Sequence, residues 1–458
     1  MHSYASPHTD PASWLAEIAQ RDPDRLFLRT PAGRRLTYSA IARLVDRIAA
    51  ALRKRGVQAA DRIVAQVEKS PEAIALYLAC LRLGAVFVPL NTAYTTAELD
   101  YFVGDADPKI AVGIAKGGVS LTDLASDESP APLDPADAKP TDLAALLYTS
   151  GTTGRSKGAM LTRANLASNA VTLAQAWRFS SSDVLLHALP IFHVHGLFVA
   201  INTVLATGCS MLFLSSFDAD EVVRLLPEAT VMMGVPTFYT RLLQLPAFTR
   251  EAAANVRLFV SGSAPLLAET HREFRERTGH AILERYGMSE TLMNTSNPYD
   301  GERVPGSVGP ALPGVEVRIA DAASGVGMIE VRGPNVFSGY WRMPEKTAAE
   351  FREDGFFITG DIGRFDRRGY LFIVGRAKDL IISGGYNVYP VEVEAELDAL
   401  NGVAESAVIG VPHPDFGEGV TAVVVPRAGA TLDESILRAA LEQRLAKYKL
   451  PKRIVFVR

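Results

Sequence analysis

Residues 147–158 (Leu-Tyr-Thr-Ser-Gly-Thr-Thr-Gly-Arg-Ser-Lys-Gly) concentrate three glycines, five Ser/Thr hydroxyls and two cations in one short stretch. Glycine lets a backbone fold tightly with its N–H groups pointing inward, which makes a concave anion site. The hydroxyls add further donors, and Lys157 adds a point charge suited to phosphate. The composition therefore predicts a polyphosphate-binding loop. The alternative is a plain surface turn rich in Gly, Ser and Thr.

This stretch is not a Walker A loop, which requires the pattern Gly-x-x-x-x-Gly-Lys-[Ser/Thr]. Here Ser156 precedes Lys157 and Gly158 follows it. The phosphate chemistry therefore belongs to another kind of loop.

The elements around the stretch can be read from the spacing of apolar residues. The apolar run 143–148 before it is short enough for a buried strand, and a helical pattern follows from Arg163 or Ala164. Nearer the N-terminus, strand patterns at 62–67 and 86–90 flank a helical pattern at 71–83. This alternation predicts βαβ units and a largely parallel sheet. The polar segment 113–140 is expected to be a flexible connection.

Length and composition limit the class of protein. A chain of 458 residues suggests two or three domains, and 48% hydrophobic with 21% charged residues is ordinary for a globular protein. The net charge of −4 provides no basic surface for nucleic acid or anionic membrane.

The cysteines and the apolar runs bear on the compartment. Cys80 and Cys209 lie in apolar surroundings, as small buried side chains do, and suggest no disulfide framework. The N-terminus has no apolar signal region, and no apolar run reaches the ~18 residues of a membrane span. We therefore expect a cytoplasmic enzyme.

A histidine-rich run at 187–196 is a second candidate for chemistry. A metal site built on His193 and His195 would need further ligands at suitable spacing, and this stretch has no Cys or Glu to supply them. A lining role in a substrate pocket is the alternative.

Three motifs together resemble the adenylate-forming superfamily of acyl-CoA synthetases, peptide-synthetase adenylation domains and luciferases. The sequence Thr-Ser-Gly-Thr-Thr-Gly-x-x-Lys-Gly resembles its phosphate loop, and Tyr-Gly-Met-Ser-Glu at 286–290 resembles its Tyr-Gly-x-Thr-Glu signature. Ser289 stands in place of the usual Thr and keeps the hydroxyl. Thr-Gly-Asp at 359–361 follows in the family's order. The resemblance covers essentially the whole chain, from residue 36 to the end.

This resemblance implies a fold and a division into domains. The expected fold is α/β, with a large multilayered N-terminal domain of mostly parallel sheets and a small α+β C-terminal domain. The expected ranges are 1–377 for ATP and acyl binding and 378–458 for the mobile domain, with Lys378 at the hinge.

The resemblance also implies roles for individual residues. Lys157, Glu290 and His193 become the candidate catalytic residues, and Glu290 with Thr149 is expected to bind Mg²⁺, a hard cation that prefers oxygen ligands. The expected roles at the nucleotide and at coenzyme A belong to Tyr286 at adenine, Asp361 and Arg376 at ribose, Ser383, Gly384 and Gly385 at pantetheine, and Ser150, Gly151, Thr152, Thr153, Gly154, Ser263, Ala264, Glu284, Arg285, Gly287, Met288 and Ser289 elsewhere.

Within the superfamily, the runs 234–241, 261–266 and 284–298 most resemble the malonyl-CoA synthetases. Arg241 and Arg285, supported by Ser263 and His193, are predicted to hold a second substrate carboxylate. A solvated face or a structural ion pair is the alternative for each arginine. His195 is expected to be structural.

The resemblance implies a two-step reaction. Malonate attacks the α-phosphorus of ATP to give malonyl-adenylate and pyrophosphate, and coenzyme A then displaces AMP. The alternatives are a fatty or other short-chain acyl-CoA synthetase, a peptide-synthetase adenylation domain, and a nucleotide-binding relic without activity. No protein partner is expected.

The family also places an adenylation lysine close to its C-terminal end, beyond the position matching Arg458. The chain as written is therefore expected to be defective in adenylation but able to complete thioester formation.

Overall fold

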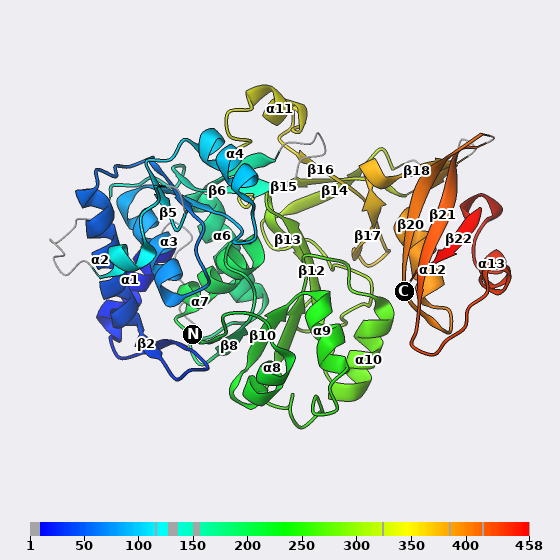
Figure 1. Cartoon of the computed structure of the whole chain (residues 1–458), viewed down its shortest axis with the longest axis horizontal. Coiled ribbons are helices and arrows are strands. Elements are labelled where there is room, and N and C mark those ends of the chain that lie inside the picture. Colours follow the sequence, from blue (N-terminus) through cyan, green and yellow to red (C-terminus); the bar gives the residue numbers. More distant parts are fainter. Residues whose placement is uncertain are drawn as a thin grey trace. The chain divides into compact units, whose positions relative to one another are not determined.

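A computed structural model describes residues 10–114, 117–126, 136–149, 156–322, 325–383, 386–414 and 416–457. The chain divides into two compact units. Figure 1 labels many of the helices and strands that they contain. The first unit comprises Met1–Pro305, Gly309–Glu316 and Val331–Phe357, and the second comprises Gly306–Val308, Val317–Glu330 and Ile358–Arg458. This division by contacts does not address the predicted hinge at Lys378, which stays a prediction.

The first unit contains two sheets. The eight-stranded sheet has the order β13-β12-β11-β10-β8-β9-β1-β2, and the other has the order β5-β3-β4-β6-β7. All neighbouring strands are parallel except the pairs β1/β2, β12/β13 and β6/β7. The predicted mostly parallel α/β architecture is confirmed.

The strands of these two sheets are β1 (Leu26–Arg29), β2 (Arg35–Thr37), β3 (Arg62–Ala65), β4 (Val86–Pro89), β5 (Ile110–Val112), β6 (Leu143–Thr149), β7 (Lys157–Thr162), β8 (Val184–His187), β9 (Ser210–Phe213), β10 (Val231–Gly234), β11 (Leu258–Ser261), β12 (Leu283–Met288) and β13 (Leu292–Ser296).

Some helices of the first unit begin and end at clear sequence signals. For example, α3 (Pro71–Leu83) has Ser70 as N-cap and ends at Gly84, whose φ of 72° suits glycine. The others are α1 (Pro11–Arg21), α2 (Tyr38–Lys54), α4 (Thr96–Ala106), α5 (Leu121–Ala125), α6 (Arg163–Ala176), the π-helix η1 (His195–Ile201), α7 (Asn202–Thr207), α8 (Ala219–Leu225), η2 (Leu226–Glu228), α9 (Pro236–Leu243), α10 (Ala268–Thr278) and α11 (Pro344–Ala349).

One expectation about the first unit is corrected. Part of the segment 113–140, predicted to be a flexible connection, forms helix α5. Ser120 caps this helix, and Leu124 is buried and anchors it to the core. A single buried leucine in a polar segment gives too little periodicity to reveal the helix.

Apolar side chains from both strands and helices fill the core beside the larger sheet. Met232 and Phe259 from β10 and β11 pack with Tyr239, Leu242 and Phe274 from α9 and α10. All five are fully buried, so this core fixes the positions of β10 and β11.

The other two sheets of the described residues lie mostly or wholly in the second unit. Most residues of the sheet β14-β15-β16-β17 belong to it, and so does the sheet β19-β18-β21-β20, where β22 pairs with β21. From Pro390 the main elements follow in the order helix, strand, strand, helix, strand.

The elements of these sheets and their neighbours are β14 (Glu316–Ala320), β15 (Gly327–Arg332), β16 (Phe357–Phe365), β17 (Leu371–Arg376), η3 (Ala377–Asp379), β18 (Ile381–Ser383), β19 (Tyr386–Val388), α12 (Pro390–Asp398), β20 (Val403–His413), β21 (Gly417–Pro426), α13 (Glu434–Glu442), η4 (Lys447–Lys449) and β22 (Arg453–Phe456). Across the described ranges, every helix is too short or too polar to traverse a bilayer.

Candidate active site

The hairpin of β6 and β7 places the two ends of the glycine-rich stretch side by side. The apolar run of β6 is buried, and its last residue, Thr149, is the cross-strand partner of Lys157, the first residue of β7. Lys157 is buried. The loop residues Ser150, Gly151, Thr152, Thr153 and Gly154 lie outside the described residues, so their predicted roles are not tested.

Glu290 joins this hairpin from a distant part of the chain. It lies in the turn between β12 and β13, where the Phe337 N–H donates to its backbone carbonyl at 2.8 Å. The Thr149 hydroxyl donates to Glu290 Oε1 at 3.2 Å. Burial raises the pKa of the Glu290 carboxyl, because the charged form loses hydration. The structure therefore brings Thr149, Lys157 and Glu290 together, as predicted.

Two residues that the sequence analysis did not single out complete this cluster. The Tyr340 hydroxyl lies 3.1 Å from Glu290 Oε1 and 2.8 Å from Glu350 Oε2, and its ring lies under the Lys157 ammonium at 4.3 Å. Lys157 Nζ is 3.4 Å from Glu350 Oε1. We call Thr149, Lys157, Glu290, Tyr340 and Glu350 the hairpin cluster. It is a concentration of charge in a largely buried place.

Arg285 is a buried cation near the end of the larger sheet. It lies in β12, is 3% exposed, and its Nε and Nη2 atoms have no hydrogen-bond partner among the described residues. A methyl group on Gly262 would lie 2.6 Å from Arg285 Nε, so the guanidinium occupies space that only glycine leaves open. Burial lowers the pKa of Arg285 to about 9, at which it is still charged at neutral pH. Such a group needs an anionic partner.

Ser263 and two histidines lie near this arginine. Ser263 follows β11 with a φ of 71°, and its hydroxyl is 3.2 Å from His195 Nδ1. His195 is buried at the start of the π-helix η1, an irregularity common at functional sites. The His195 backbone N–H donates to His193 Nδ1 at 3.2 Å. Burial lowers the pKa of both imidazoles, and the positive charge of Arg285 lowers it further. The pKa of His193 falls to about 4.

These contacts bring Arg285, Ser263, His193 and His195 into one neighbourhood. His195, which the sequence analysis expects to be structural, therefore contacts a candidate substrate-binding hydroxyl. Its side-chain Nε2 is buried without a partner among the described residues. A hydrogen-bonding role is what this position favours.

Arg241 differs from Arg285 in its surroundings. It lies exposed on α9, whereas its neighbours Tyr239 and Leu242 are buried. No contact between Arg241 and the Arg285 neighbourhood is recorded for the described residues. A shared role of the two arginines stays a prediction.

Glu284 is a buried carboxyl beside Arg285 in the chain. Its Oε1 accepts from the Leu266 N–H at 3.1 Å, while its Oε2 has no partner among the described residues. Burial raises the pKa of Glu284 from 4.5 to about 8, and the Leu266 N–H and Arg285 oppose that rise only in part. In the free protein this carboxyl is mostly protonated at neutral pH.

The raised pKa of Glu284 predicts how stability depends on pH. The folded state binds this proton more tightly than the unfolded state, so the free energy of unfolding should fall as pH rises from about 4.5 to about 8. In Glu284→Gln this contribution should vanish, so the free energy of unfolding should change less with pH than in the wild-type protein. Urea unfolding of both proteins at about pH 5.5, 7 and 8 measures it. Equal slopes in the two proteins would contradict the assignment.

The remaining predicted nucleotide residues of the first unit lie around β12. Tyr286 is buried on that strand, and the others, Ala264, Gly287, Met288 and Ser289, are at least partly exposed. These positions do not test the roles predicted for these residues at the nucleotide, which stay predictions.

In the second unit, Asp361 and Arg376 are cross-strand partners in β16 and β17, with Arg376 Nε 3.2 Å from Asp361 Oδ1. The register thus unites the two predicted ribose-binding residues. Ser383 is buried at the end of β18, and Lys378 is exposed in η3. Gly384 and Gly385 lie outside the described residues.

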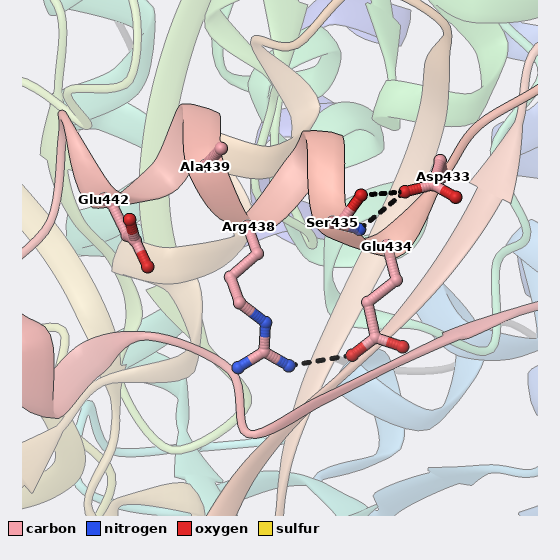
Figure 2. Close-up of a pocket in the computed structure, with 6 residues that line it drawn as sticks. All are labelled: Asp433, Glu434, Ser435, Arg438, Ala439 and Glu442. Carbon is pink, nitrogen blue, oxygen red and sulfur yellow. Dashed lines mark hydrogen bonds and ion pairs between the residues drawn. The ribbon is translucent and has the colours of Figure 1, made fainter.

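A surface hollow on α13 contains none of the predicted residues. Figure 2 shows its lining, in which Arg438 pairs with Glu434 at 2.7 Å and Asp433 accepts from the Ser435 N–H at 2.8 Å. These charged groups already have partners within the helix, so the hollow is not a candidate site.

Comparison with known proteins identifies the family to which the chain belongs. The AMP-binding enzyme family matches residues 15–341, and the AMP-binding enzyme C-terminal domain matches residues 392–458. A feruloyl-CoA synthase of an Amycolatopsis species is 37% identical over 97% of this chain and 94% of that protein. A malonate–CoA ligase of Arabidopsis thaliana is 36% identical over 86% of this chain and 74% of that protein.

Among solved structures, ATP-bound MatB from Rhodopseudomonas palustris is 57% identical, with a TM-score of 0.93 over 97% of this chain and 95% of that chain. A malonyl-CoA ligase with methylmalonyl-CoA and AMP bound is 38% identical, with a TM-score of 0.70 over 95% of this chain and 96% of that chain. Because the family match spans well over half the chain and the fold agrees, the chain belongs to the AMP-binding enzyme family.

Proposed function

We propose that this protein joins malonate to coenzyme A at the expense of ATP, through a malonyl-adenylate. The chain is an AMP-forming acid–thiol ligase, and relatives named for malonate or malonyl-CoA are 36% and 38% identical to it. The observation that carries the choice of malonate is the buried Arg285, whose Nε and Nη2 atoms have no partner among the described residues. An acid with a second carboxylate supplies that partner.

The hairpin cluster would serve the triphosphate. Lys157 would neutralise phosphate charge, and the loop residues 150–154 would donate backbone N–H groups to it. Glu290 and Thr149 offer a carboxylate and a hydroxyl oxygen 3.2 Å apart, a donor set that fits Mg²⁺. When bound, the ion would withdraw charge from the phosphates. These residues position the α-phosphorus for attack and provide no covalent chemistry.

The Arg285 neighbourhood would orient the acid. The guanidinium would hold the distal carboxylate, with Ser263 and His193 as supporting hydrogen-bond partners. The low pKa of His193 keeps its imidazole neutral at neutral pH. Its Nε2–H can therefore donate to the substrate while its Nδ1 accepts from the His195 backbone N–H. The other carboxylate is then free to attack the α-phosphorus.

The other assignments belong to the same proposal. Tyr286 would stack on adenine, Asp361 and Arg376 would bind the ribose hydroxyls, and residues 383–385 would admit pantetheine. Lys378 would be the hinge between domains 1–377 and 378–458. A cytoplasmic location is supported by two cysteines that are free and buried.

An aromatic or fatty acid is the rival substrate class, since relatives are also named for feruloyl-CoA and long-chain fatty-acid ligation. Such an acid would leave Arg285 buried and unpaired, at a cost of several kcal/mol. The Arg285 environment therefore favours a dicarboxylate.

A substrate panel read by AMP release tests the proposal. Malonate should be used far better than acetate, propionate, butyrate or ferulate, and methylmalonate is accepted if the pocket has room for a methyl group. Titration of ATP by calorimetry, run beside pyrophosphate release by a chain that carries the family's C-terminal adenylation lysine, separates an enzyme from a nucleotide-binding relic. Preference for butyrate or ferulate would refute the choice of malonate, and ATP binding without turnover of any acid would favour the relic.

A further inference from the structure

The ammonium of Lys157 already has an anionic partner within the hairpin cluster. Lys157 Nζ lies 3.4 Å from Glu350 Oε1, and the two side chains are only 9% and 20% exposed. Lys346 contacts the same carboxylate oxygen, with its Nζ 2.6 Å from Oε1. Glu350 therefore pairs with two cations, one of them the proposed phosphate-binding lysine.

Tyr340 fixes Glu350 in this position. Its hydroxyl contacts both Glu350 Oε2 and Glu290 Oε1, and its ring faces the Lys157 ammonium. Glu350 is thus held among the groups proposed to receive the triphosphate and its metal. A carboxylate offers the same features as a phosphate oxygen, namely negative charge and hydrogen-bond acceptance.

Backbone pairing explains how a residue so far along the chain reaches Lys157. The segment 338–341 pairs with the edge of β7, through Ser338 N–H to Met160 O at 3.0 Å and Trp341 N–H to Gly158 O at 2.8 Å. The short helix α11 follows, and Glu350 comes directly after it. The Tyr340 N–H also donates to the Thr347 hydroxyl at 2.8 Å, which ties α11 back to the paired segment.

We propose that Glu350 is an internal substitute for the triphosphate, which holds Lys157 in the nucleotide-free protein and is displaced by ATP. This inference rests on the proposed role of Lys157 in phosphate binding. ATP must exchange the Lys157–Glu350 pair for a Lys157–phosphate pair, and the displaced carboxylate then repels the incoming phosphates. Both effects weaken ATP binding. Glu350 therefore lowers the affinity for ATP and is not itself required for ATP to bind.

Removing the charge of Glu350 should therefore tighten ATP binding. Glu350→Gln should lower the Kd for ATP by about fivefold, the size expected for one partly screened ion pair. Isothermal titration of the full chain, without acid or coenzyme A, measures this value. Glu345→Gln is the matched control, because Glu345 is exposed on α11 and removes the same charge away from Lys157.

Two further variants keep the test decisive. Glu350→Asp retains the charge but shortens the side chain by one methylene, so it should also tighten ATP binding, to a smaller extent. In a Lys157→Met background, Glu350→Gln should change the Kd much less, because the partner that it competes for is gone. The same titrations with ATP and EDTA should keep the effect, since it acts through Lys157 and not through a metal.

The outcomes separate this inference from the proposed function. If Lys157→Met leaves ATP binding unchanged, the phosphate role of Lys157 is wrong. If Lys157→Met weakens binding but Glu350→Gln weakens it too or leaves it unchanged in a folded protein, Glu350 is not a triphosphate substitute. An equal gain from Glu345→Gln would show a general charge effect and overturn the inference as well.

Discussion

Glu290→Gln should lower kcat for malonate-dependent pyrophosphate release by about 10²–10³-fold, the usual cost of one lost transition-state charge contact. Glutamine keeps the shape of the side chain and can still accept from the Thr149 hydroxyl, now 3.2 Å from Glu290 Oε1. What it loses is the negative charge that a Mg²⁺ ligand supplies. The measurement is kcat at saturating ATP over a series of Mg²⁺ concentrations.

Raised Mg²⁺ should recover part of the lost activity, because a weakened metal site fills at higher concentration. Glu345→Gln, which removes an exposed carboxylate on α11, should leave kcat unchanged. Near-normal kcat for Glu290→Gln at ordinary Mg²⁺ would show that Glu290 does not serve the metal.

The local elements could be predicted from the sequence because their signals are local. The 71–83 pattern has an N-cap serine before it and a glycine after it, and the structure forms α3 over those residues. The apolar run before the glycine-rich stretch became β6 for the same reason. Periodicity did not predict that Glu290 contacts Thr149, 141 residues away; the ordered family motifs implied it.

The parts of the site that were missed depend on tertiary pairing. Glu350 reaches Lys157 because segment 338–341 pairs with the edge of β7. No sequence motif predicts that this segment pairs with that strand. His195 was expected to be structural, and the approach of the loop after β11, which no sequence pattern indicates, places Ser263 against it.

The two arginines show a signal that was available but not used. On α9, the buried positions Tyr239, Leu242 and Leu243 define the face toward the core. Arg241 lies off this face, since residues of one helical face recur three or four positions apart. Arg285 instead lies in a strand buried along most of its length. Arg241 is therefore exposed and Arg285 buried, although the sequence analysis predicted the same role for both.

That difference makes Arg285→Ala the sharpest test of the acid site. The variant should lose kcat/KM for malonate by several orders of magnitude, since sites built on a buried polar partner reject analogues without it by about 10⁴-fold. Butyrate, which never offered a second carboxylate, should be affected little, so the malonate-to-butyrate ratio should collapse. The Kd for ATP should change much less, because the hydrogen bonds and ion pairs of the hairpin cluster among the described residues do not include Arg285.

Two further variants and one wild-type measurement decide the interpretation. Arg272→Ala removes an exposed arginine of α10 and should leave both kcat/KM values unchanged. Gly262→Ala keeps the guanidinium but places a methyl group 2.6 Å from Arg285 Nε, so it should also lower the malonate-to-butyrate ratio. Arg285 then selects malonate by its position as well as its charge. Comparable kcat/KM for butyrate and malonate in the wild-type protein would refute the dicarboxylate proposal, because an unpaired guanidinium would then contribute nothing to selectivity.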